Sequence, residues 1–156
     1  MDKTLTISYK EYDSVAELTA GDREMLEAAA AATEGAYAPY SGFRVGAALR
    51  LADGRVVCGS NQENAAYPSG LCAERTAVFA ASTQFPQQRD YEAIAIVGRT
   101  AEGEWCEAAP CGACRQVLQE YERHQGHPLR VICRLAGGRV RVVPDVASLL
   151  PFGFDF

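Results

Sequence analysis

LCAER at residues 71–75 and PCGACRQ at residues 110–116 organise this chain, because together they hold its densest cluster of soft metal ligands and ionisable groups. Cys111 and Cys114 are separated by two residues, so both thiolates can reach a single ion from one turn of backbone. Cys72 would add a third thiolate and leave a tetrahedral zinc ion with one open position, as in catalytic sites. Glu74 is better suited to moving protons beside the metal than to binding it. We therefore predict one catalytic Zn²⁺ ion per subunit.

Both stretches are predicted to begin helices, over residues 72–81 and 112–123. The thiolates would then lie where unpaired backbone amides and the positive ends of helix dipoles gather. Such positions lower the pKa of a thiol and stabilise the thiolates that zinc requires. Residues two apart within a regular helix point to nearly opposite sides, but at the first turn Cys72 and Glu74 can converge on a point beyond the helix end.

The rest of the pattern predicts a sheet packed between helices. An alanine-rich helix is expected at residues 25–32, after a capping signal at residues 19–22. Asp53-Gly54 is a hairpin turn between two alternating segments. The expected strands cover residues 43–51, 55–60, 92–97, 129–135 and 139–143. This order indicates an α/β protein, a three-layer α/β/α sandwich with a mixed five-stranded sheet.

The length of 156 residues suits one domain that buries its core without disulfides. Hydrophobic residues make up 48% and charged residues 22%, which is a globular composition rather than a disordered one. We expect a single catalytic domain over residues 21–156, preceded by an N-terminal extension at residues 1–20. The alternation at residues 5–9 is consistent with an edge strand or with an arm that contacts a neighbouring subunit.

Several function classes are disfavoured by composition. The apolar runs are too short for a membrane span, and residues 1–4 lack the layout of a secretion signal. We therefore expect a cytoplasmic protein, in which the Cys-x-x-Cys pair is a metal site rather than a disulfide. Cys58, Cys106 and Cys133 are interpreted as ordinary core or surface residues. The net charge of −5 offers no general attraction for a polyanion, so a small molecule is a better partner than nucleic acid.

Cys72-Ala73-Glu74 and the Pro-Cys-x-x-Cys of residues 110–114 also resemble the signature of the zinc nucleobase deaminases. The resemblance is to their three-cysteine branch, the cytidine deaminases that act on free nucleosides. YAPYSGFRVGAA at residues 37–48 and NQENA at residues 61–65 look like further blocks of this family, in its order and at its spacing. The resemblance covers about residues 26–151.

This resemblance implies hydrolytic deamination of cytidine and 2'-deoxycytidine to uridine and 2'-deoxyuridine, with release of ammonia, in pyrimidine salvage. Glu74 would pass protons from water to ring N3 and then to the leaving amine. Asn61 and Glu63 would hold the ribose hydroxyls, and Phe43 would flank the base. The backbone at Ala73 would approach the substrate.

The family also implies a homo-oligomer, a tetramer or else a dimer, whose neighbouring subunits complete each site. The aromatic tail fits such an interface because apolar side chains need a place to be buried. Its members are Phe152, Phe154 and Phe156, and none of them is assigned to the site.

Two arginines directly follow the ligand stretches and can offset the negative charge of three thiolates by hydrogen-bonding to sulfur. Arg75 is favoured, because the resemblance places an arginine there. Arg115 is equally consistent with a surface ion pair of little energetic value. Phe43 is, on spacing alone, also consistent with core packing in a strand.

Other functions stay open at this point. One is deamination of another aminated heterocycle, such as blasticidin S, although Asn61 and Glu63 favour a substrate that carries ribose. Another is a noncatalytic zinc-binding interaction module. Glu74 distinguishes the two, because an enzyme needs its carboxylate and such a module does not. Editing of RNA or single-stranded DNA is opposed by the acidic charge and by the lack of an aromatic and basic surface run.

Overall fold

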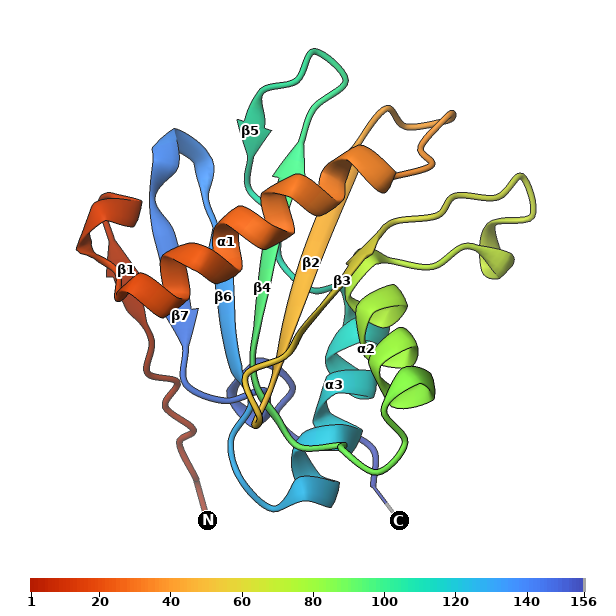
Figure 1. Ribbon diagram of the computed structural model, residues 1–156. Coiled ribbons are helices and arrows are strands. Elements are labelled where there is room, and N and C mark those ends of the chain that lie inside the picture. The colour runs from red at the N-terminus through yellow and green to blue at the C-terminus, as the bar shows by residue number, and fades with distance from the viewer. Residues whose placement is uncertain (156) are drawn as a thin grey trace.

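A computed structural model describes residues 1–155 of the chain. Over these residues a single sheet is covered by α1 on one face and by α2 and α3 on the other (Figure 1). The helices are α1 (Ala20–Ala32), α2 (Ala73–Gln84) and α3 (Gly112–Gln125). The strands are β1 (Lys10–Tyr12), β2 (Arg44–Leu51), β3 (Val56–Ser60), β4 (Tyr91–Arg99), β5 (Trp105–Cys106), β6 (Arg130–Arg134) and β7 (Val140–Val143).

The sheet is mixed, with the strand order β1-β7-β6-β4-β2-β3 and with β5 paired to β4. β4 and β6 run parallel, whereas the other pairs are antiparallel. The predicted three-layer fold is confirmed, and its five expected strands correspond to β2, β3, β4, β6 and β7. The described chain adds two short strands, β1 and β5, at the margins of this sheet.

The alternation of side chains along β4 divides the core into two layers. Ile94 and Ile96 pack in the cluster that contains α2 and α3 residues, whereas Ala95 and Val97 pack with residues of α1. Successive side chains of a strand point to opposite faces, so one buried strand serves both layers. This explains why the sequence of β4 is apolar almost throughout.

Two glycines bring helices close to the sheet from opposite sides. A Cβ atom on Gly59 of β3 would lie 2.4 Å from the backbone nitrogen of Ala77 in α2, and one on Gly46 of β2 would lie 1.9 Å from the carbonyl oxygen of Ala29 in α1. Any larger residue at either position would push a helix away. Gly59 therefore fixes the distance between the sheet and the helix that follows Cys72.

The helix and turn predictions hold, with shifted ends. α1 starts at Ala20, because the Thr19 side chain accepts a hydrogen bond from the amide of Asp22 at 3.2 Å and caps the helix there. The Asp53-Gly54 turn joins β2 to β3 as expected, with Gly54 at a φ of 88°. No helix within residues 1–155 is both long enough and apolar enough to cross a membrane.

The N-terminal strand lies later than the alternation at residues 5–9 suggested. Lys10–Tyr12 pair with β7, and Glu11 forms ion pairs with Arg139 at 3.5 Å and Arg141 at 2.8 Å. These charge pairs favour the observed register, whereas residues 5–9 are exposed and outside any strand. A role of residues 1–20 as an arm on a neighbouring subunit stays a prediction. In the aromatic tail, Phe152 and Phe154 are exposed, and Phe156 lies outside the described residues.

Candidate active site

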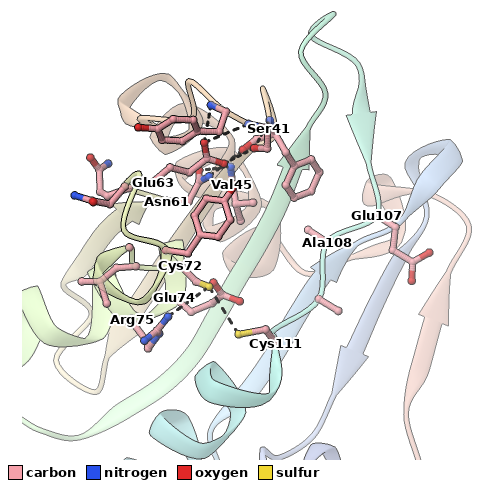
Figure 2. A pocket seen from close by; sticks show the side chains of 18 residues that line it. Ser41, Val45, Asn61, Glu63, Cys72, Glu74, Arg75, Glu107, Ala108 and Cys111 are labelled. Carbon is pink, nitrogen blue, oxygen red and sulfur yellow. Dashed lines mark hydrogen bonds between the residues drawn. The ribbon is translucent and has the colours of Figure 1, made fainter.

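Three cysteines meet where α2 and α3 begin. Cys72 is the N-cap of α2, Cys111 is the N-cap of α3, and Cys114 lies in the first turn of α3. Their sulfur atoms all lie within 4.8 Å of one another, and the sulfurs of Cys72 and Cys111 are 3.7 Å apart (Figure 2). Within residues 1–155 this is the one group of three or more potential ligand side chains close enough to hold an ion.

The geometry of the cluster fits tetrahedral zinc. Zinc–sulfur bonds of about 2.3 Å at tetrahedral angles place neighbouring sulfurs roughly 3.8 Å apart. The 3.7 Å between the sulfurs of Cys72 and Cys111 agrees with this spacing. The start of each helix also presents a positive dipole end to the thiolates. The three cysteines can therefore hold zinc, and two of them, Cys72 and Cys111, border the cavity.

The sulfur atoms of the cluster shift one another's pKa values. The pKa of Cys72 is lowered to about 5, first because Cys114 donates a hydrogen bond to its sulfur and also because the Arg75 guanidinium lies beside it. The same contact with Cys72, together with burial, raises the pKa of Cys114. A metal cation binds thiolates rather than thiols, so metal binding to such a site releases the protons of its cysteines.

Arg75 and Arg115 make different contacts, although each follows a ligand stretch. Arg75 donates a hydrogen bond from Nη2 to the sulfur of Cys72 at 3.7 Å (Figure 2). Arg115 instead donates to two backbone carbonyls, that of Pro110 at 2.8 Å and that of Leu149 at 3.0 Å. Arg75 therefore has the contact with sulfur that was expected of it, whereas Arg115 forms neither a sulfur contact nor an ion pair in the described structure.

Glu74 lies in the first turn of α2, beside the sulfur cluster, and is only 3% exposed. Burial raises the pKa of its carboxyl group to about 7, and the negative charge of Cys72 adds to this shift. A carboxyl group with such a pKa can both accept and donate a proton near neutral pH. Glu74 also lines the cavity that Cys72 and Cys111 border.

This cavity has a volume of about 640 Å³ and extends from the sulfur cluster to two loops. Its wall includes Phe43, Asn61 and Glu63, three of the residues expected to bind a substrate. The fourth, Ala73, is the first residue of α2; it is fully buried in the core and is not part of the cavity wall. The structure thus brings most of the predicted chemical and recognition residues to one cavity, whereas Ala73 and Cys114 are buried behind it.

At the loop end, polar side chains hold the backbone in place. Asn61 accepts a hydrogen bond from the amide of Val45 at 2.8 Å and donates one to the carbonyl of Phe43 at 2.9 Å. Glu63 accepts hydrogen bonds from the Ser41 hydroxyl and from the amides of Tyr40 at 3.0 Å and Ser41 at 3.3 Å. These hydrogen bonds lower the pKa of the Glu63 carboxyl group, and the bond from the Ser41 hydroxyl contributes most. Both residues therefore shape the loop that carries Phe43.

Sequence reasoning missed several residues of this wall. Tyr40 and Tyr67 form an edge-to-face pair with ring centroids 6.5 Å apart, and both border the cavity. Tyr40 and Ser41 belong to the block at residues 37–48, but nothing in the pattern singled them out. Glu107 also borders the cavity, although its carboxylate points away from the other labelled side chains (Figure 2).

Comparisons of the sequence with known proteins all point to one family. Residues 19–125 match the family described as the cytidine and deoxycytidylate deaminase zinc-binding region. The chain is 52% identical over 100 residues to a cytidine deaminase of Halalkalibacterium halodurans, an alignment that covers 64% of this chain and 71% of that protein. It is 43% identical over 102 residues to a cytidine deaminase of Mycobacterium tuberculosis, over 64% of this chain and 72% of the relative.

Solved structures agree with this result. The crystal structure of cytidine deaminase from Burkholderia pseudomallei superposes with a TM-score of 0.74 at 45% sequence identity. The match covers 88% of this chain and 100% of that chain. The chain is therefore similar to these proteins both in the sequence around its site and in its fold.

Proposed function

The chain belongs to the cytidine and deoxycytidylate deaminase family, and we propose that it hydrolytically deaminates cytidine and 2'-deoxycytidine with one zinc ion per subunit. Cytidine deamination itself follows from curated relatives that are 43–52% identical and from the family match. One observation carries the mechanism: the buried carboxyl group of Glu74 borders the same cavity as the sulfur cluster.

The reaction exchanges the C4 amine of the cytosine ring for an oxygen atom of water and releases ammonia. Zinc held by Cys72, Cys111 and Cys114 would supply Lewis-acid activation of that water. Glu74 accepts a proton from the attacking water and delivers it to ring N3. It then carries a second proton to the amine that leaves from C4. Its burial limits the contact of its carboxyl group with bulk water, and its raised pKa suits both directions.

Arg75 supports this chemistry through the ligand that it contacts. Three thiolates give the metal a surplus of negative charge, and a guanidinium donor on sulfur withdraws part of it. The bond from Arg75 to Cys72 is the contact that such a role needs.

The loop end of the cavity suits the sugar and the flank of the base. Asn61 and Glu63 offer amide and carboxylate groups to ribose hydroxyls, and Phe43 offers an aromatic face that is 36% exposed. The backbone at Ala73, between Cys72 and Glu74, would approach the substrate. A volume of about 640 Å³ is within the range of small-ligand pockets.

The assembly and the cell context are part of the same proposal. A homotetramer, or else a dimer, would cover the exposed aromatic side chains of Phe152 and Phe154. Residues 1–20 would form an extension to a catalytic domain of residues 21–156, and the protein would act on free nucleosides in the cytoplasm.

The test is the loss of ultraviolet absorbance when cytidine, deoxycytidine, cytosine or blasticidin S is mixed with zinc-loaded protein. We expect turnover of the two nucleosides, and no turnover after the metal has been stripped. Activity on blasticidin S alone would instead identify a deaminase of another heterocycle. A folded, zinc-loaded protein that turns over none of these compounds would refute the proposed enzyme.

A further inference from the structure

The C-terminal segment, residues 146–155, lies against α3 and is held there through its backbone. The side chains of α3 that hold it recur about once per helical turn, so they share one side of the helix. Arg115 donates a hydrogen bond to the Leu149 carbonyl, and Gln119 donates one to the Leu150 carbonyl at 3.0 Å. Glu122 accepts hydrogen bonds from the amides of Val146 at 2.7 Å and Ala147 at 2.9 Å. Figure 1 shows the end of the chain beside this helix.

This attachment is close-packed. A Cβ atom on Gly153 would lie 1.8 Å from the side-chain oxygen of Gln119, so the segment touches the helix at that point. Gln116 bonds both the amide and the carbonyl of Phe154, at 3.2 Å and 3.1 Å. The C-terminal segment is therefore attached to α3 at several points along most of its length.

Arg115 differs from the other side chains in this set, because it also binds the residue before a predicted ligand. Its Nε donates to the carbonyl of Pro110 at 2.8 Å while its Nη1 donates to the carbonyl of Leu149 at 3.0 Å. Cys111 is exposed and, as the N-cap of α3, makes no side-chain capping hydrogen bond. The Cys111 sulfur contacts that of Cys72 at 3.7 Å, and the backbone at Pro110, directly before Cys111, helps to set where this sulfur lies.

We propose that Arg115 is a positioning residue, which bridges Pro110 to the C-terminal segment and so fixes the Cys111 sulfur beside Cys72. The inference rests on the proposed metal site. The rigid fork of a guanidinium can hold two carbonyls at once, whereas an ammonium group is a point donor on a flexible stem. The bridge thus requires arginine for its shape as well as for its charge.

The experiment compares R115A and R115K with the wild type and with R123A. Arg123 is a matched control on the same helix, because it binds the same segment through the Phe154 carbonyl at 3.2 Å and Asp155 at 3.0 Å but does not contact Pro110. The rate of zinc transfer to an excess of a chelating dye is measured at 25 °C, with the melting temperature of each sample. The visible spectrum of the cobalt-substituted proteins reports the ligand geometry.

We expect zinc release to be about 10- to 100-fold faster in R115A and R115K, the usual cost of losing a group that orients a ligand. The cobalt spectrum should change in both variants. R123A should release zinc at the wild-type rate, even where its melting temperature falls.

Wild-type release from folded R115A would overturn the proposal, and so would full rescue by R115K, which would assign the effect to charge alone. If R115A does not fold, R115K decides. Failure of both to fold would make Arg115 a fold-stabilising residue and would also overturn it. A wild-type protein that holds no zinc would refute the proposed function first, which separates the two failures.

Discussion

The two ends of the cavity are built in different ways. At the sulfur end, Cys72, Glu74, Cys111 and Cys114 lie at helix N-caps or in first turns, and Glu74 is 3% exposed. At the loop end, Phe43 is 36% exposed, and its loop is held by side chains that reach across 16 to 23 positions of the chain. The first end is placed by helices and the second by hydrogen bonds between loops.

This difference separates chemistry from recognition. Side chains on packed helices hold their geometry within narrow limits, as proton transfer and metal binding require. Loops tied by a few polar contacts adapt more easily to a ligand. We therefore expect substitutions at the sulfur end to change metal content or kcat, and substitutions at the loop end to change KM.

The largest effect is expected from C111A, which removes a predicted ligand. The two remaining thiolates bind zinc weakly, so turnover should fall below detection and purified protein should lose its metal. Metal content by atomic absorption and cytidine turnover are the measurements. C58S is the control, since Cys58 is another exposed cysteine but lies outside the cluster. Full zinc content in C111A would contradict the assignment.

E74Q should lower kcat by about 10²- to 10⁴-fold, the usual contribution of a positioned general acid and base. Zinc content and melting temperature should stay at wild-type levels, because Glu74 does not hold the metal. E107Q is the matched control, as Glu107 borders the same cavity with its carboxylate turned away. Comparable loss in both variants would point to a nonspecific effect of charge.

E63Q should raise KM for cytidine about 10-fold with a smaller change in kcat, the order expected for losing a charged hydrogen-bond acceptor. The loop around Ser41 loses its anionic anchor in the same variant. Steady-state kinetics over a range of cytidine concentrations measure the effect. A fall in kcat at unchanged KM would remove the distinction between the two ends of the cavity.

The smallest effect is a pH dependence of the loop. Hydrogen bonds from Ser41 and Tyr40 lower the pKa of Glu63 below its ordinary value of 4.5. A carboxyl group whose pKa is lower in the folded state stabilises the fold above its unfolded-state pKa, and this contribution is lost as the pH falls through the folded-state value. The difference in urea midpoint between wild type and E63Q should be present at pH 7 and shrink below pH 4.5. A difference that grows with acidity would reverse the assigned sign.

Much of the sulfur end was predictable because its signals are local. The Cys-x-x-Cys spacing and the helices that follow residues 72 and 111 depend on neighbouring residues only, and both helices start at the expected places. The hairpin at Asp53-Gly54 was equally local. The strand at residues 10–12 was misplaced, because its register depends on Arg139 and Arg141, far away along the chain.

The sequence by itself determined the order of helices and strands, and it predicted the ligand set and the proton-carrying carboxylate, since capping, periodicity and ligand spacing act over a few residues. Only the tertiary structure decided that the sulfurs of Cys72 and Cys111 lie 3.7 Å apart, that Asn61 and Glu63 tie the loop of Phe43, and that Arg115 binds two carbonyls. These contacts join segments distant in sequence. Their geometry depends on how closely the helices pack against the sheet. Gly59, which has no side chain, allows α2 to approach the sheet closely.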